Sequence, residues 1–368
     1  MKTAILLSTF WSFLLIGILC ADDIEKWNVP STSHKLEFPR DHGSHPDFRI
    51  EWWYLTGHLF SGERRFGFQA TFFRLGQRPV DIEPGELFGD SQIYLAHMAL
   101  SDPETGTFLH ESRLNRGGWD ASAAVGKLDV RNGNWSLVGD GDSMKLQGSI
   151  QTEAAFSMTL TPTQPHVVFG EDGISRKGPE GTAASYYITF PRLAAEGELE
   201  IGGEKFEVNG EVWMDHEISS SQLDRNQVGW DWVSIQFFDG RELMGYILRE
   251  KDGRPSEWSR LVWIDEDGTL THLSPDEFQW IGGGEWSSSI TGAVYPISPT
   301  IATVDPASGK AVRLKIQPLF EEQEVTGSPG GVSYWEGACD VLDENGKALG
   351  RAYLELTGYA DDIGEKLR

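Results

Sequence analysis

The chain has 368 residues, among them 42 glycines, 19 Phe, 14 Trp and 9 Tyr. Glycine is unfavourable inside helices and aromatic residues are frequent in strands, so this composition favours strands joined by tight turns. The formal net charge of −25 excludes nucleic acid and anionic membrane surfaces as partners, because both recruit clustered Lys and Arg. At about 150 residues per domain, the length predicts two domains or one large one.

The N-terminus has the pattern of a secretory signal peptide. Lys2 precedes an apolar run that ends at Cys20, and polar residues follow. We therefore expect residues 1–21 to be removed and the protein to be secreted or periplasmic, with no stable membrane span. A retained membrane anchor is the alternative. Lipid attachment at Cys20 is less favoured, because Leu19 is bulky. Cleavage would leave Cys339 as the only cysteine, so no internal disulfide is expected.

Two-residue turn signals recur along the whole chain. They include Ser61-Gly62, Asn132-Gly133, Asn209-Gly210, Asp239-Gly240 and Asn345-Gly346. The segments between them, such as YLAHMAL, FSMTLT, YYITF and AYLELTGY, alternate in polarity or are rich in aromatic residues. This spacing predicts an all-β fold of short strands, in a sandwich or a barrel. Because no GxGxxG loop precedes a helix pattern, no nucleotide cofactor is expected.

An internal match indicates that one β unit occurs twice. Residues 51–63 align with residues 229–241 at an offset of 178, and the next strand continues the match. The aligned pairs are Trp52 with Trp230, Tyr54 with Trp232, and Phe66-Gly67-Phe68 with Met244-Gly245-Tyr246. Chance gives a few such matches, but a shared offset across two strands favours duplication. We expect an N-terminal domain over residues 34–217 and a C-terminal domain over residues 218–361.

The alternation of side chains gives each predicted strand two faces. One face of the first copy combines aromatic and hydrogen-bonding residues: Trp52, Tyr54, Thr56, His58 and Phe60. In the second copy, Asp231 falls on the opposite face, together with Val233 and Ile235. If the strand is paired there, Asp231 lies among apolar side chains and its pKa is raised. The alternative places Asp231 at the mouth of the strand, solvated or capping a loop.

The densest group of ionisable residues lies between the two copies. Asp215, His216 and Glu217 follow Trp213, and the GWDW segment that contains Asp231 begins twelve residues after Glu217. A carboxylate can orient a histidine and tune its acidity, and ligand sites are frequent at domain junctions. The alternative is a polar corner at a strand end, satisfied by backbone groups.

The segment DHGSHPDFRIEWWY offers a second group of polar residues. Its His42, His45, Asp47 and Glu51 could suggest metal ligands, but zinc sites usually have tighter spacing or cysteines. We therefore expect no metal, and a polar loop that leads into a strand. Glu51, next to two tryptophans, is more interesting as a buried acid.

Three other polar residues lie within predicted strands. His97 has the pattern of a satisfied core residue, with a catalytic role as the alternative. Glu336 and Glu355 lie among aromatic residues and are either buried acids or hydrogen-bond partners of backbone or Trp N–H groups. No GxSxG segment marks a hydrolase nucleophile.

Six segments, taken in order, resemble one known family: EWWYLTGHL, YLAHMALSD, WMDHE, GWDW, YWEGA and YLELTGY. The resemblance is to the carotenoid 1,2-hydratase and AttH-like proteins and extends from about Phe38 to Tyr359. It implies two lipocalin-like antiparallel β-barrel domains packed side by side, in agreement with the internal repeat. The family also resembles fungal cyclases that shape polyene substrates, and many bacterial members carry the label of predicted secreted hydrolases.

The resemblance implies a reaction that needs no cofactor. A buried acid protonates a terminal isoprenoid C=C bond, aromatic faces stabilise the tertiary carbocation, and water captures it. Asp231 is expected to donate the proton, with His216 and Asp215 orienting the acid or the water. The residues expected to contact the substrate are Glu51, Trp53, Tyr54, His97, Trp213, Trp230, Trp232, Tyr246 and Glu336.

The sequence is compatible with two functions. One is acid-catalysed hydration of an isoprenoid or polyene, in which case Asp231→Asn abolishes turnover and leaves ligand binding intact. The other is a non-catalytic secreted or periplasmic carrier of a hydrophobic small molecule, which the export signal and the missing nucleophile favour.

Overall fold

The computed structural model of the chain describes residues 27–77, 92–118, 120–179 and 183–364, so the predicted signal peptide lies outside the described residues. Within these ranges the fold is all-β, with a single short 3₁₀ helix, η2 (Arg40–His42). None of the helical structure described there is long and apolar enough to cross a membrane.

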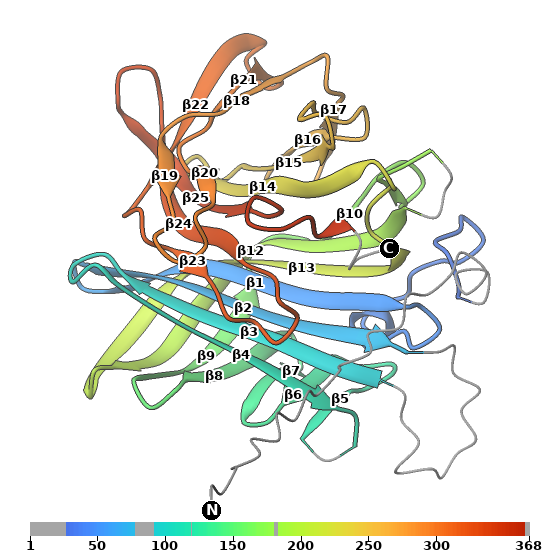
Figure 1. Ribbon diagram of the computed structural model, residues 1–368, viewed down its shortest axis with the longest axis vertical. Helices are drawn as coiled ribbons and strands as arrows, with labels where there is room; N and C mark the ends of the chain where they lie inside the picture. The colour runs from blue at the N-terminus through green and yellow to red at the C-terminus, as the bar shows by residue number, and fades with distance from the viewer. Residues whose placement is uncertain (1–26, 78–91, 119, 180–182, 365–368) are drawn as a thin grey trace, which may run out of the picture.

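The first sheet has thirteen strands and curls into a nearly closed barrel (Figure 1). They are β1 (Ile50–Ser61), β2 (Arg64–Gly76), β3 (Gln92–Asp102), β4 (Thr107–Arg116), β5 (Ala121–Ala123), β6 (Asp129–Asn132), β7 (Trp135–Asp140), β8 (Ser143–Ile150), β9 (Ala154–Pro162), β10 (Val167–Phe169), β11 (Ser175–Arg176), β12 (Ala184–Ile201) and β13 (Glu204–Ser221). The order of the main path is β4-β3-β2-β1-β13-β12-β9-β8-β7-β6-β5. Packed apolar side chains such as Trp53, Phe66 and Leu146 fill the barrel interior.

The second sheet has ten strands and forms a half-barrel. They are β14 (Gln227–Phe237), β15 (Glu242–Glu250), β16 (Arg260–Ile264), β17 (Leu270–Leu273), β18 (Gln279–Ile281), β21 (Thr300–Asp305), β22 (Lys310–Pro318), β23 (Glu324–Val325), β24 (Tyr334–Leu342) and β25 (Ala348–Leu356). A separate hairpin consists of β19 (Glu285–Ser287) and β20 (Val294–Pro296).

The strand orders of the two sheets correspond, as expected for a duplicated unit. The path of the second sheet is β17-β16-β15-β14-β25-β24-β22-β21-β18, so β14 takes the place of β1 and β25 that of β13. The chain passes from the first sheet to the second between Ser221 and Gln227, and the predicted boundary at residue 217 falls inside β13.

The offset of 178 holds for the first strand of the repeat but is wrong for the second. His58 pairs with Gly67, nine residues later, whereas the equivalent Gln236 pairs with Glu242, six residues later. The connection in the second copy is therefore three residues shorter. As a result Gly67 lies against Ala338 of the other domain, while Gly245 lies against Leu261.

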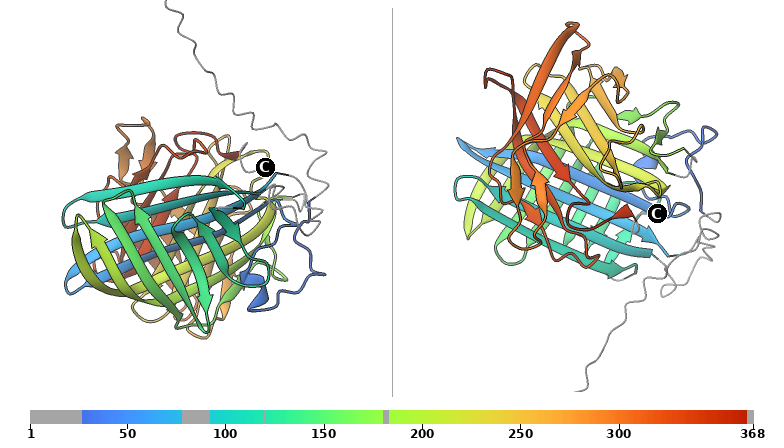
Figure 2. Two further views of the ribbon diagram at one scale, coloured as in Figure 1. Left: turned by 90° about the horizontal axis from the view of Figure 1, so that it is seen from below. Right: turned by 45° about the horizontal axis from the view of Figure 1, so that its top comes forward.

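The two sheets pack through equivalent faces, so that β1, β12 and β13 lie next to β14, β24 and β25 (Figures 1 and 2). Trp52 and Tyr54 point to this interface, and their neighbours Trp53 and Leu55 point into the first barrel. Alternation in a strand therefore divides the polar residues into an interface group and two barrel groups.

Candidate functional site

Aromatic side chains from both domains line the interface. Tyr54, Tyr187 and Trp213 come from the first domain and Trp232 and Tyr353 from the second, and all five are buried. The Tyr54 and Trp232 rings meet edge to face, with centroids 5.2 Å apart. Such a surface favours apolar ligands and can stabilise a positive charge.

Asp215 lies in this interface, on the face of β13 that points to the second domain. Its carboxyl group accepts hydrogen bonds from the hydroxyls of Tyr187 at 2.7 Å and Thr189 at 2.5 Å, and from the indole N–H of Trp213 at 2.8 Å. Trp232 of the second domain donates its indole N–H to the Tyr187 hydroxyl at 3.0 Å. All of these donors are neutral, so none supplies a full positive charge to Asp215.

Two further carboxyl groups lie on neighbouring strands of the second domain. Glu336 and Glu355 are directly opposed on β24 and β25, a position that places Cβ atoms about 4.5–5.5 Å apart. Tyr54 donates its hydroxyl to Oε1 of Glu336 at 2.5 Å, and Trp230 donates its indole N–H to Glu355 at 3.2 Å. The Tyr334 hydroxyl also lies close to this carboxyl group and lowers its pKa, but Oε2 of Glu336 has no partner with full hydrogen-bond geometry among the described residues.

The pKa values of these three carboxyl groups are raised. Burial raises the pKa of Asp215 to about 7. Burial, with the neighbouring Asp215 and Glu217, raises the pKa of Glu355 to about 7. Burial and the neighbouring Glu355 raise the pKa of Glu336 well above its usual value. In the described part of the chain no salt bridge reaches Asp215, Glu336 or Glu355, so they keep protons at a pH where ordinary carboxyl groups are ionised.

Four buried polar atoms on the strands that face each other across the interface lack hydrogen-bond partners among the described residues. They are Thr56 Oγ1, Gln69 Oε1, Tyr353 OH and Glu336 Oε2. Thr56 and Gln69 are cross-strand partners on the interface side of β1 and β2, while Tyr353 and Glu336 lie on the facing strands β25 and β24. A buried polar atom without a hydrogen-bond partner lowers the stability of the fold by about 1–3 kcal/mol. A bound polar group or water at these atoms would therefore be favourable.

One ion pair borders the acids. Lys177 donates to Glu217 and to Oε1 of Gln222, the latter at 2.5 Å. The ammonium group lies 5.8 Å from the Trp52 ring centre and 5.3 Å from that of Tyr187. Glu217, the last acid of the predicted DHE group, therefore has a cation partner that Asp215 lacks.

His97 connects the two domains. Its Nδ1 lies 2.6 Å from the Tyr334 hydroxyl and its Nε2 lies 3.0 Å from the Ser328 hydroxyl. Burial lowers the pKa of His97 to about 3, so the imidazole is neutral and acts as a hydrogen-bond partner.

The mouth of the first barrel holds a different polar group. Glu51 is fully buried and accepts hydrogen bonds from Nε of Arg74 at 3.0 Å and from the backbone N–H of His45 at 2.9 Å. His216 lies 2.9 Å from Oε1 of Glu51 and stacks on Trp53 with ring centroids 4.7 Å apart. Hydrogen bonds from His216 and His45, together with Arg74, hold the pKa of Glu51 well below its usual value despite its burial.

Asp231 lies inside the second barrel, as its strand position predicts. It is buried, forms an ion pair with Arg249 and accepts the Tyr359 hydroxyl at 3.0 and 3.1 Å. Burial raises the pKa of Asp231, and the Arg249 guanidinium opposes the rise. The alternative of a solvated Asp231 at the strand mouth is therefore wrong.

The structure separates the predicted catalytic residues. Asp215 points to the interface, His216 into the first barrel and Asp231 into the second, because successive side chains of a strand point to opposite faces. The expected cooperation of His216 with Asp231 has no geometric basis. Of the predicted contact residues, Tyr54, His97, Trp213, Trp230, Trp232, Tyr246 and Glu336 lie between the domains, whereas Glu51 and Trp53 lie in the first barrel.

Sequence reasoning missed Tyr187, Lys177 and the two arginines Arg74 and Arg249. Tyr187 lies in the YYITF segment, where its alternation with Thr189 indicates a shared face. Arg74 follows two phenylalanines in the apolar second half of its strand, and a basic residue in such surroundings was a usable signal of an ion pair. Lys177, in a turn-rich segment, carries no comparable signal.

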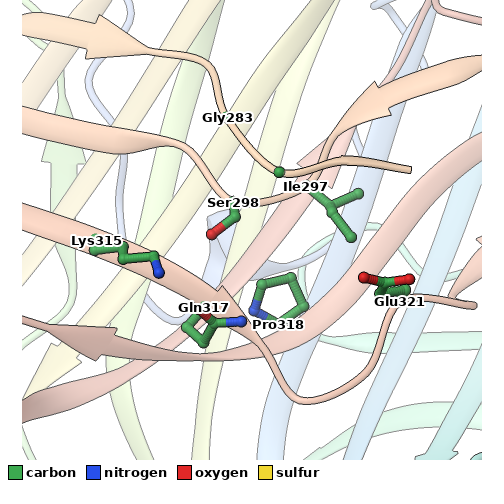
Figure 3. A pocket seen from close by; sticks show the side chains of 8 residues that line it. Gly283, Ile297, Ser298, Lys315, Gln317, Pro318 and Glu321 are labelled. Carbon is green, nitrogen blue, oxygen red and sulfur yellow. The ribbon is translucent and has the colours of Figure 1, made fainter. Parts of the chain in front are cut away.

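Two surface hollows lie on the second sheet and contain none of the predicted site residues. One, of about 390 Å³, is lined by Gly283, Gly284, Ile297, Ser298, Lys315, Gln317, Pro318 and Glu321 (Figure 3). The other, of about 500 Å³, includes Phe238, Arg241 and Lys347. Neither has the buried acids and aromatic residues of the interface.

Fold and interface together define a protein of two barrel-like domains with carboxyl groups of raised pKa buried between them. The sequence profile of the AttH-like family matches residues 29–359, so this chain belongs to the AttH-like family. No curated protein matches the chain.

Solved structures agree with this assignment. An AttH protein from Nitrosomonas europaea is 37% identical, with a TM-score of 0.77, and the match covers 89% of this chain and 98% of that one. Kievitone hydratase from Nectria haematococca is 14% identical, with a TM-score of 0.64 and coverage of 89% and 93%. CghA is 11% identical, with a TM-score of 0.50 and coverage of 84% and 88%. The last two similarities concern the fold alone.

Proposed function

We propose that the protein binds an apolar unsaturated molecule, such as an isoprenoid or polyene, between its domains and adds water to a C=C bond without a cofactor. The observation that carries the proposal is the Glu336 carboxyl group. It is fully buried, has no cation partner among the described residues, and leaves Oε2 unpartnered beside aromatic side chains of both domains.

Interface side chains support each step of the proposed reaction. Because Tyr54 donates to Oε1 of Glu336, the acid proton resides on Oε2 and is available to an alkene carbon. Protonation forms a C–H bond and leaves a tertiary carbocation, which the faces of Trp213 and Trp232 stabilise. Water then forms the C–O bond, and its extra proton passes to the Glu336–Glu355 pair, which restores the acid.

A comparison of two carboxyl variants tests the proposal. The full chain is incubated with linear polyenes, including lycopene and squalene, in H₂¹⁸O, and mass spectrometry detects the addition of labelled water. Glu336→Gln is expected to lower turnover by about 10²–10⁴-fold and to leave polyene binding intact, as for the loss of a general acid. Asp231→Asn, the matched control, is expected to keep turnover.

The outcomes separate three accounts. Loss of turnover in Asp231→Asn alone would overturn the assignment to Glu336 and support the acid predicted from sequence. Polyene binding without turnover in the wild-type protein would support a carrier. The same interface supports that second candidate, since its aromatic residues suit an apolar molecule whether or not chemistry follows.

We also propose that the protein is exported, on the basis of Lys2 and the apolar run up to Cys20. N-terminal sequencing of protein recovered from the periplasm or medium tests this proposal. A mature N-terminus near residue 22 supports it, and an intact N-terminus on cytoplasmic protein contradicts it.

A further inference from the structure

The DHGSHPDFRIEWW segment converges on a place that the interdomain site does not use. His45 lies in the loop before β1, Glu51 lies near the start of β1, and His216 lies on the adjacent strand β13. Trp53 and His216 are direct cross-strand partners, so Glu51 and His216 enter the same barrel mouth. Residues distant in sequence thus form one cluster.

The three side chains present their polar atoms to one point. Nδ1 of His45 and Nε2 of His216 each lie 2.9 Å from Oε1 of Glu51. All three atoms lie within 4.8 Å of one another. The side chains of Glu51 and His216 are 0% and 1% exposed, and that of His45 is 14% exposed. The cluster is therefore buried on one side and reaches the surface at His45.

We propose that this cluster is a binding site for one divalent transition-metal ion such as Zn²⁺, with Nδ1 of His45, Oε1 of Glu51 and Nε2 of His216 as ligands. Two imidazoles and one carboxylate are a ligand set that such ions accept, and they leave further coordination positions open. The inference is independent of the proposed hydration, because Asp215 lies on the opposite face of β13 and Glu336 and Glu355 lie on strands of the second domain.

The surroundings already orient these ligands. Arg74, Ser44 and the backbone N–H of His45 hold Oε2 of Glu51, which leaves Oε1 facing the two imidazoles. Oδ1 of Asp41 lies 3.3 Å from the remaining nitrogen of His45. A carboxylate on the outer nitrogen of a ligating histidine is a common support of metal sites, since it fixes the ring and its tautomer.

Charge sets the expected strength of the site. Glu51 and Asp41 supply negative charge, whereas Arg74 and Arg40, which bind these two carboxylates, oppose an added cation. We therefore expect weaker binding than in closed structural zinc sites with cysteine ligands, and a preference for ions that favour imidazole. Without an ion, the same imidazoles donate hydrogen bonds to Glu51, which is the competing account.

Metal titration of the full chain tests the proposal. Protein freed of metal with a chelator is titrated with Co²⁺, followed by visible absorption, and with Zn²⁺, followed by calorimetry. The expected result is one ion per chain and a higher melting temperature. Asp41→Asn removes a carboxylate that supports the His45 ligand, and it is expected to weaken metal binding by about 10–100-fold. His216→Gln and His45→Gln each remove a ligand and are expected to weaken metal binding at least as much.

Two histidine variants serve as controls. His97→Gln removes a buried histidine of the interface, and His34→Gln removes an exposed one that lies with Asp41 and His45 in an alternative outer group. Both are expected to bind the ion as the wild type does. The proposal would be overturned if the wild-type protein bound no stoichiometric metal ion. It would also be overturned if His34→Gln lost metal binding while His216→Gln retained it. If His216→Gln fails to fold, the more exposed His45→Gln gives the same decision.

Discussion

Buried carboxyl groups occupy two contrasting settings in this protein. In the first barrel Glu51 forms an ion pair with Arg74, and in the second barrel Asp231 forms one with Arg249. Between the domains, Asp215, Glu336 and Glu355 receive hydrogen bonds from hydroxyl and indole groups and have no cation partner among the described residues. Each barrel carboxylate neutralises the charge of an arginine, whereas the interface carboxyl groups have no cation beside them and therefore tend to keep their protons.

The two barrel arginines occupy equivalent positions within the duplicated fold, although their acid partners do not. Arg74 is the cross-strand partner of Glu51, and Arg249 is the partner of Gly229, which takes the position of Glu51 in the second copy. Each arginine also donates to backbone carbonyl groups, of Phe48 in the first barrel and of Thr357 in the second. An arginine repeated at the same place in both copies, and paired with a buried acid in each, indicates a structural role in closing each barrel.

The largest expected effect concerns these arginines. Arg74→Met leaves the buried Glu51 carboxylate without its cation and is expected to lower the free energy of unfolding by about 3–5 kcal/mol, and Arg249→Met to do the same for Asp231. Urea unfolding followed by tryptophan fluorescence measures both. Arg254→Met, which removes an exposed ion pair, is the control and should cost less than about 1 kcal/mol. Losses below about 1 kcal/mol in both barrel variants would contradict the comparison.

A smaller effect is expected at the domain contact. A Cβ atom added at Gly67 would lie 2.5 Å from the Cβ of Ala338, so Gly67→Ala forces β2 away from β24. Overpacking of this kind costs about 1–3 kcal/mol. The control is Gly139→Ala, because a Cβ atom added at Gly139 would have its nearest neighbour, the Cβ of Leu128, at 3.5 Å. Gly62→Ala is a poorer control, because Gly62 has a positive φ that alanine rarely adopts. Equal stability of Gly67→Ala and the wild type would argue against close packing of the domains.

The raised pKa values of the interface carboxyl groups also predict how the stability of the protein depends on pH. The folded-state pKa values of Asp215 and Glu355 are raised to about 7, so between about pH 4 and pH 7 the folded state binds more protons than the unfolded state. Their contribution to stability is therefore present at low pH and lost as pH rises through 7, by at most about 1.4 kcal/mol per pH unit for each group. Urea unfolding of wild type and Glu355→Gln over this range measures the difference, and an identical slope in both would contradict it.

Much of the fold follows from local sequence rules. The turn dipeptides and aromatic segments predicted an all-β protein, and the pairing of Trp52 with Trp230 indicated two similar units, which the matching strand orders confirm. The register of the second strand was not predictable from the offset. Gly67 and Gly245 look equivalent in sequence, but a connection three residues shorter places them on opposite faces.

The site was predicted in part, for the same geometric reason. Asp215, His216 and Glu217 are adjacent in sequence, yet a strand sends His216 to the face opposite its two neighbours. The partner of Asp231 was hidden because Arg249 lies on the next strand, and no local pattern connects the two. Glu336 stood out only as an acid among aromatic residues, and its contact with Tyr54 spans 282 residues.

The central expectation is that the Glu336 carboxyl group, which has no cation partner among the described residues, is protonated near neutral pH, whereas the ion pair with Arg249 keeps Asp231 ionised although burial raises its pKa. Infrared difference spectroscopy tests it directly, because a protonated carboxyl group has a carbonyl stretching band that a carboxylate lacks. Spectra of the wild type at pH 7, minus those of Glu336→Gln and of Asp231→Asn, isolate each group. The account predicts a protonated-carboxyl band in the first difference and its absence from the second. A band in the Asp231→Asn difference alone would contradict the account.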